Sequence, residues 1–102
     1  MSDVTVLTID TIISNPKVRS GRPIIAGTTL RVQDVAAHHR YRQYTPDELA
    51  YQLQITLAQV HAALAYYYAH KDELDAQMEE DDRLIREAKE QGIGQRDPSL
   101  LR

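Results

Sequence analysis

Apolar and β-branched residues in the first third of the chain predict extended backbone. Residues Val4–Ile9 are all apolar or β-branched, which predicts a strand. Asn15–Pro16 predicts a turn. The segment Gly21–Arg31 contains two glycines, a proline and several β-branched residues, and predicts one or two short strands. Because so small a sheet is marginal alone, it should lie on helices or pair with a second copy of the chain.

After Arg31 the apolar positions recur at helical spacing. A first helix is predicted from Val32 or Gln33 to about residue 42. The second begins with Thr45 as N-cap, Pro46 at the first helical position and a glutamate three residues after the cap. Thr56 is the predicted N-cap of a third helix, and Gln59 lies three residues after it.

The third helix has no clear stop signal. No glycine or proline occurs between Leu57 and Gly92, and a helix of about 35 residues would be ~50 Å long, too long for the core of this domain. Either the helix breaks near Lys71–Glu73, or its second half extends and packs on another chain. The pattern predicts a mainly α fold: a three-helix body of the helix-turn-helix type, a short N-terminal β element and a long C-terminal helix.

Charge divides the chain into two predicted domains, 1–71 and 72–102. Residues 1–71 hold seven basic and five acidic side chains, a net charge of +2, whereas residues 72–102 hold five basic and ten acidic ones, a net charge of −5. A mildly basic body with an acidic tail favours an interaction role, although a solvated acidic helix on an ordinary domain gives the same pattern.

Several classes of protein are disfavoured by composition. The chain has no cysteine, which excludes a disulfide framework and a thiolate zinc site. No apolar stretch approaches the ~20 residues of a membrane span, and the N-terminus does not resemble a signal peptide. We therefore expect a cytoplasmic protein without membrane contact. All six aromatic residues are tyrosines, and each needs a hydrogen-bond partner if it is buried.

Residues 48–63 have the spacing of a helix-turn-helix. Ala50 is small where two helices would cross, Ile55 would lie beneath the turn, Thr56 would cap the second helix and Val60 would pack back on the first. Gln54 occupies the turn position usually held by glycine, and therefore requires a positive φ or a different turn. A plain three-helix core is the alternative.

The second helix of this unit offers few groups for base readout. It has no arginine or lysine for guanine, but Gln59 can read adenine and His61 can contact a phosphate or a base. The candidate DNA-binding residues are Thr56, Gln59 and His61, together with Arg40, Arg42, Lys17, Arg19 and Arg22 as phosphate contacts. The alternative is that these scattered arginines are simply solvated.

The histidines do not form a metal site. His61 and His70 lie nine residues apart and face opposite sides of a helix, and His70 with Glu73 supplies only two ligands. No Ser–His–acid set, phosphate-binding loop or pair of buried carboxylates is evident. We expect no metal, no cofactor and no catalytic residue, and a metal-dependent enzyme is the weakest of the three function classes.

The acidic tail has too few apolar residues to fold alone but enough to bind a partner as an amphipathic helix. The alternative is a solvated helix that frays. Of the three consecutive tyrosines Tyr66–Tyr68, at least one must point away from the core, either onto the first helix or towards a partner. The candidate partner-binding residues are Tyr66, Leu74, Met78, Arg83, Leu84, Ile85, Arg86, Ile93, Arg96, Leu100 and Leu101.

One motif resembles a known family. The pattern Gly-x-Pro-x-Ile-x-Gly-Thr-x-Leu-x-Val at residues 21–32, preceded by Asn15–Pro16 and followed by Ala-Ala-Leu-x-Tyr-Tyr at residues 62–67, resembles DUF433, a family of small bacterial and archaeal proteins. The likeness covers roughly residues 8–78, and Pro46, Glu48, Leu49 and Val60 also match. Two positions depart: Thr29 stands where most members have arginine, and Leu53–Thr56 stands where members often have Tyr-Pro-x-Leu.

The resemblance implies a homeodomain-like body and the role of antitoxin in a type II toxin–antitoxin pair. The body would dimerise and bind promoter DNA, and the tail would neutralise a PIN-like ribonuclease toxin. Such a nuclease holds metal with clustered carboxylates, among which an arginine of the tail can lie by charge pairing; Arg83, Arg86 and Arg96 are the candidates. The alternative is a protein-interaction or assembly module that does not bind DNA.

Overall fold

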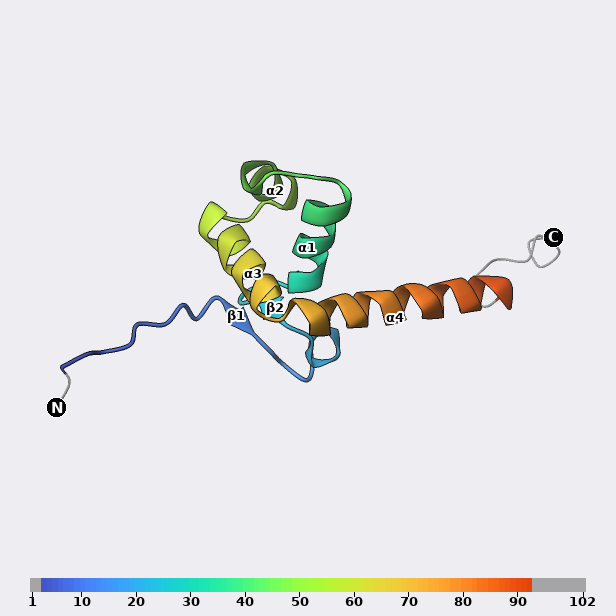
Figure 1. Cartoon of the computed structure of the whole chain (residues 1–102), viewed down its shortest axis with the longest axis horizontal. Coiled ribbons are helices and arrows are strands. Elements are labelled where there is room, and N and C mark those ends of the chain that lie inside the picture. The colour runs from blue at the N-terminus through green and yellow to red at the C-terminus, as the bar shows by residue number, and fades with distance from the viewer. Residues whose placement is uncertain (1–2, 93–102) are drawn as a thin grey trace. The chain divides into compact units, whose positions relative to one another are not determined.

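The computed structural model describes residues 3–92, which belong to two compact units. The first unit ends at His70, and the second begins at Lys71. In chain order the first unit contains β1 (Ile12–Ile13), the 3-10 turn η1 (Arg19–Gly21), β2 (Ile24–Ile25), α1 (Val32–Tyr41), α2 (Pro46–Leu53) and α3 (Leu57–Ala69), and the second contains α4 (Lys71–Glu90) (Figure 1). The predicted mainly helical fold, with a short N-terminal β element and a long C-terminal helix, is confirmed.

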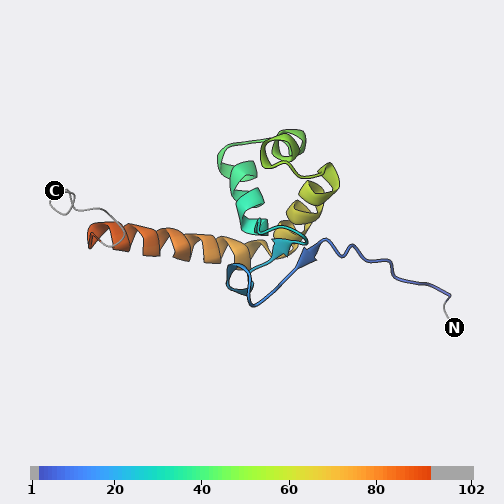
Figure 2. The same ribbon diagram turned by 180° about the vertical axis from the view of Figure 1, so that it is seen from behind.

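The two strands form a minimal antiparallel sheet. Ile12 lies opposite Ile25 and Ile13 opposite Ile24, and an isolated bridge joins Ile24 to Arg31. Gly27 has a φ of 80° in the turn that follows β2, a conformation that favours glycine. Both isoleucines of β2 are buried, and β1 lies against α3, seen from behind in Figure 2. The sheet therefore depends on the helices, as its size requires.

The predicted strand over Val4–Ile9 is wrong. These residues form neither helix nor strand, and the first strand begins only at Ile12. Among the described residues no strand pairs with this segment. Strand propensity expresses the fit of a side chain to a pleated, half-buried surface, and this segment has no such surface. Its aliphatic side chains are 79–88% exposed.

A left-handed stretch of backbone connects the two strands. The predicted turn at Asn15–Pro16 is present, because the Val18 amide donates to the Asn15 carbonyl at 2.9 Å. Three consecutive residues then have positive φ: Arg19 at 51°, Ser20 at 59° and Gly21 at 78°. For residues with a side chain this conformation is costly, and here it leads the chain into β2.

The second and third helices begin as predicted. Thr45 Oγ1 accepts a hydrogen bond from the Glu48 amide at 3.2 Å, and Glu48 Oε1 accepts one from the Thr45 amide at 3.3 Å. At α3, Thr56 Oγ1 accepts from the Gln59 amide at 3.0 Å, and Gln59 Oε1 accepts from the Thr56 amide at 2.7 Å. Each start is a reciprocal capping box, which satisfies amides that lack a partner within the helix.

The core of the first unit lies where α3 packs against α1 and α2. Val35, Leu49, Val60 and Ala63 are fully buried there, and burial of each larger aliphatic side chain contributes about 1.5–3 kcal/mol. Tyr67 is also 0% exposed, and its hydroxyl receives a hydrogen bond from an arginine of α1. The need of a buried tyrosine for a polar partner is thus met within the core.

The long helical pattern breaks at His70, one residue before the predicted region. His70 has φ −126° and ψ 33°, and its amide donates to the carbonyls of Tyr66 and Tyr67. Its ring stacks on the Tyr66 ring, with centroids 4.1 Å apart. At the other end of α4, Gly92 has φ 74° and its amide donates to the Lys89 carbonyl, as expected of a helix terminator.

Candidate nucleic-acid interface

The connection between α2 and α3 is a turn of three residues, Gln54–Thr56. Gln54 has φ 55° and ψ 46°, so of the two predicted alternatives the chain adopts the positive φ. The Ile55 amide donates to the Ala50 carbonyl at 3.1 Å and closes the end of α2. Both Ala50 and Ile55 are half-buried. A left-handed glutamine costs about 1–2 kcal/mol, and the Thr56 capping box that follows the turn offsets part of this cost.

The first turns of α3 present one surface to solvent. Thr56, Ala58 and His61 are exposed, and Leu57 is 43% exposed. Gln59 is half-buried, and its side chain folds back to cap the helix. In that position it does not extend from the helix as a bidentate contact to adenine requires. His61 is therefore the most available polar side chain of this surface.

Three of the five predicted phosphate contacts have partners within the protein. Arg40 Nη1 donates to the Tyr67 hydroxyl at 2.7 Å. Arg22 Nη1 donates to Gln33 Oε1 at 2.8 Å, and Arg19 Nη2 lies 3.8 Å from Asp34 Oδ2. These guanidinium groups hold the β element and α3 to α1, which is a structural role.

Two basic side chains have no such role. Lys17 and Arg42 are exposed, and among residues 3–92 neither side chain has a hydrogen-bond or ion-pair partner. Over residues 3–70 six basic side chains stand against five acidic ones, a net charge of +1. Lys17 and Arg42 are consequently the cations of the first unit that are most available to a phosphate.

The elements of this unit coincide with a family model. Residues 12–67, from the first residue of β1 to the buried tyrosine of α3, match DUF433, described as a protein family of unknown function. The chain belongs to the DUF433 family. No curated protein and no solved structure is significantly similar to it. The DUF433 match covers the minimal sheet, α1, α2 and α3 as far as Tyr67, and it ends before α4.

Thr29, where the resemblance led us to expect arginine, is exposed, and nothing in the structure explains the threonine. Arg31, two residues later, pairs with Asp34 through Nε at 3.2 Å and Nη2 at 2.9 Å, and its amide donates to the same carboxylate at 3.1 Å. This arginine therefore fixes the first turn of α1 and is not displayed for a ligand.

Two further findings bear on the chemistry of the DUF433 chain. Within residues 3–92, no cluster of three or more histidine, aspartate or glutamate side chains could hold a metal ion. No helix in the same range is long and apolar enough to cross a membrane.

The second unit is an acidic helix with an internal ion-pair network. Over Lys71–Glu90 four basic side chains stand against nine acidic ones, a net charge of −5. Arg83 pairs with Glu80, and its Nη1 lies 2.6 Å from Glu87 Oε1. The hydrogen bond from Arg83 lowers the pKa of Glu80, and Glu80 in turn raises the pKa of Arg83.

The predicted partner-binding residues of this helix differ in exposure. Leu74 and Met78 are only 2% and 8% exposed, so they add nothing to an accessible apolar surface. Leu84 and Ile85 are 51% and 53% exposed. Arg86 is exposed, and its side chain has no partner among residues 3–92. The remaining candidates, Ile93, Arg96, Leu100 and Leu101, lie outside the described residues.

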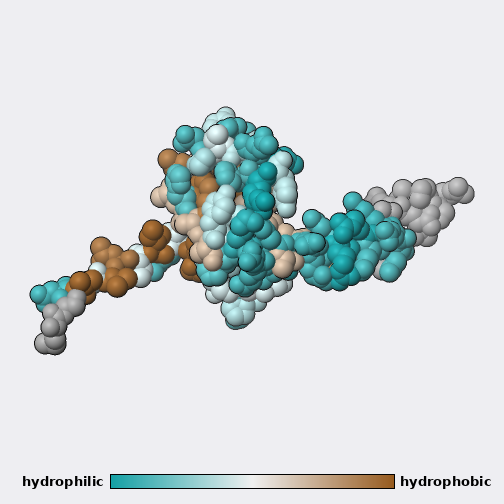
Figure 3. Space-filling model, in the orientation of Figure 1, coloured by the Kyte–Doolittle hydropathy of each residue, from teal (hydrophilic) through white to brown (hydrophobic). Residues whose placement is uncertain are grey.

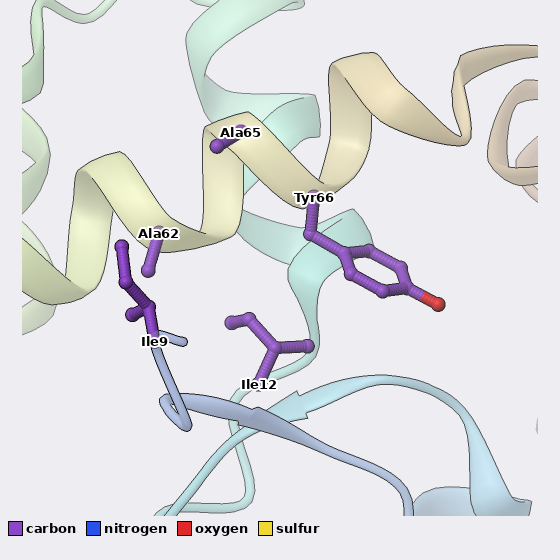
Figure 4. A pocket seen from close by; sticks show the side chains of 5 residues that line it. All are labelled: Ile9, Ile12, Ala62, Ala65 and Tyr66. Carbon is purple, nitrogen blue, oxygen red and sulfur yellow. The ribbon is translucent and has the colours of Figure 1, made fainter. Parts of the chain in front are cut away.

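A pocket on α3 escaped the sequence analysis. It has a volume of about 330 Å³ and is lined by Ile9, Ile12, Ala62, Ala65 and Tyr66 (Figure 4). The half-buried Tyr66 lines this pocket, and its predicted contact with a partner stays a prediction. The available signal was the pair of small residues three positions apart on one helix face, Ala62 and Ala65, which leaves room beside a helix.

Proposed function

We propose that this DUF433 protein is the antitoxin of a toxin–antitoxin pair. Its first unit binds promoter DNA as a dimer, and its second unit binds and neutralises a PIN-like ribonuclease. The observation that carries the proposal is the α2–turn–α3 unit, in which two capped helices flank a three-residue turn and the first turns of α3 remain exposed. This is the arrangement in which a second helix enters the major groove with its N-terminal residues foremost.

The contacts to DNA would be mostly electrostatic. Thr56 and His61 on α3 would face the groove, while Arg42 and Lys17 would neutralise phosphates. Because Gln59 caps its own helix, base readout is limited, and sequence preference should be modest. Affinity should then fall steeply with salt, with a slope of about −0.9 for each phosphate contact.

The contact with the toxin would use exposed side chains on more than one side of α4, because consecutive helical residues do not share a face. Leu84 and Ile85 offer half-exposed aliphatic surface, and the neighbouring Arg86 is free to enter a cluster of carboxylates. Arg83 is less suited, because Glu80 and Glu87 already hold it. Its network would instead stiffen the helix for docking.

The DNA-binding half of the proposal is tested by a gel shift with the DNA upstream of the chain's own reading frame, at two salt concentrations. Arg42→Ala should weaken binding and lower the salt slope by about one unit. Lys89→Ala on α4 removes the same charge from the other unit, and should leave the DNA affinity and its salt slope unchanged. If the unaltered protein at micromolar concentration gives no salt-sensitive retardation, the protein does not bind this DNA.

A second function, a protein-interaction module without DNA binding, is favoured by one observation. The exposed part of α3 is largely apolar, with Leu57, Ala58 and Ala65, and four of the body's five arginines have internal partners. The two functions are distinguished by combining the gel shift with co-purification of the protein encoded next to this chain. Retained partner binding without any gel shift favours the interaction module.

A further inference from the structure

Three neighbouring side chains are exposed where α3 begins. Leu57 is 43% exposed, and Ala58 and His61 are exposed as well. His61 follows Leu57 by four positions and Ala58 by three, so on the helix surface it is a neighbour of both. Figure 3 shows hydrophobic surface over the beginning of this helix. We call these three residues the α3 face.

The polar side chains next to the α3 face are engaged within the helix. Thr56 Oγ1 accepts a hydrogen bond from the Gln59 amide, and Gln59 Oε1 accepts one from the Thr56 amide. His61 is the one other polar side chain between residues 57 and 64. Two of the three side chains in the α3 face are therefore apolar, and its polar chemistry is limited to one imidazole ring.

The base edges of DNA contain one apolar group that such a face fits. In the major groove every exposed base group is a hydrogen-bond donor or acceptor except the C5-methyl group of thymine. An aliphatic side chain against a donor or acceptor removes water from that group without replacing its hydrogen bond, which costs free energy. Against a methyl group the same side chain gains the free energy of apolar burial.

A groove in another protein is a poorer occupant for this face. Such a groove takes long apolar anchors repeated along one side of a helix. Leu64, seven residues after Leu57, is only 7% exposed, and the next position on that side is Ala65. The first unit also carries the exposed cations Lys17 and Arg42 and a net charge of +1 over residues 3–70, which favours a polyanion.

From these observations we propose that Leu57 and Ala58 contact thymine methyl groups in the major groove, with Leu57 as the residue that determines specificity. The inference rests on the proposed DNA binding and deepens it by naming the base group that the protein distinguishes. His61 would donate to the N7 atom of a purine, which adenine and guanine share, and so adds little discrimination.

The expected discrimination is modest. Burial of one methyl group contributes about fourfold in affinity, or about 0.8 kcal/mol. A bidentate hydrogen-bonded contact from a long polar side chain discriminates more strongly, but Gln59 caps its own helix. A preference that depends on one or two thymine methyl groups therefore agrees with a protein whose affinity is mainly electrostatic.

The test compares two versions of the DNA upstream of the chain's own reading frame. In the second version every thymine is replaced by uracil, which lacks the methyl group and keeps both the base pair and the O4 acceptor. Fluorescence anisotropy titration with the full chain should show at least fourfold weaker binding to the uracil DNA. The salt slope should be the same for both, because the phosphate contacts are unchanged.

A protein variant shows whether Leu57 carries the difference. Leu57→Ala should lower the ratio of the two affinities at least twofold, because the aliphatic partner of one methyl group is gone. Leu7→Ala is the matched control, since it removes the same side chain from a position that is 88% exposed and outside the helices. This control should keep the full ratio. The ratio compares two DNAs with one protein sample, so a partly unfolded fraction does not alter it.

The outcomes separate this inference from the proposed function. Equal affinity of the unaltered protein for the two DNAs overturns thymine recognition and leaves DNA binding standing. A ratio that Leu57→Ala does not change overturns it as well, because the preference would then come from DNA shape. If neither DNA is bound, both proposals fail. Loss of the neighbouring protein's co-purification in Leu57→Ala would then identify the α3 face as a protein interface.

Discussion

Arg40 and Tyr67, 27 residues apart in the chain, are joined by a hydrogen bond of 2.7 Å from Arg40 Nη1 to the Tyr67 hydroxyl. Tyr67 belongs to the fully buried core, whereas Arg40 lies in the last turn of α1. The contact therefore links α1 to α3 at the point where the core meets solvent. It also gives a structural role to a guanidinium group that the sequence had suggested as a phosphate contact.

The first prediction concerns this pair. Tyr67→Phe should lower the free energy of unfolding by about 1–2 kcal/mol, because the lost hydrogen bond involves a charged donor. Arg40→Ala should cost about 1–3 kcal/mol, because it removes a donor from a buried hydroxyl. Urea denaturation of both variants and of the double variant gives their coupling, which should exceed about 0.5 kcal/mol. Strictly additive effects would show that the bond does not link the helices in solution.

The second prediction concerns the turn between α2 and α3. Gln54→Gly should stabilise the protein by about 1 kcal/mol, because glycine adopts the left-handed conformation of Gln54 without steric cost. Gln52→Gly, in the last helical turn of α2, should destabilise it by a similar amount. The midpoints of urea denaturation measure both changes, provided that the dependence of the unfolding free energy on urea concentration is the same in all variants. A destabilising Gln54→Gly would mean that residue 54 is not left-handed.

The third prediction concerns the pH dependence of α4. The hydrogen bond from Arg83 lowers the pKa of Glu80 in the folded helix relative to the unfolded chain. The pair therefore stabilises α4 at pH values above the unfolded pKa of Glu80, and this stabilisation is lost as the pH falls through the folded pKa. Carboxyl NMR titration should show the pKa of Glu80 rising in Arg83→Gln. The same titration in Arg86→Gln should match the unaltered protein.

Local signals were sufficient to predict most of the helical body. Thr45 with Pro46, and Thr56 with its amide partner, located two helix starts because capping depends on residues within one turn. At Gln54 the sequence left open a positive φ or a different turn, and only the structure decided between them. The end of α4 near Gly92 could also be predicted from local sequence, since glycine favours the positive φ found there.

Features that depend on distant residues could not be predicted in this way. Val4–Ile9 was predicted as a strand because its residue types favour β structure, but a strand needs a neighbour, and none pairs with it among residues 3–92. The break at His70 has no glycine or proline to announce it, and His70 itself satisfies the carbonyls of Tyr66 and Tyr67 there. The internal partners of Arg22 and Arg40 lie 11 and 27 residues away, so the sequence could not separate these arginines from the available Arg42.

The central claim is that DNA binding belongs to the first unit and toxin binding to α4. Its most direct test is a fluorescence anisotropy titration of labelled upstream DNA with the unaltered protein, Arg42→Ala and Arg86→Ala. Each substitution removes one exposed cation, but from different units. We expect salt-dependent binding that Arg42→Ala weakens severalfold and Arg86→Ala leaves unchanged. Equal losses in both variants, or no salt-dependent binding by the unaltered protein, would contradict this division.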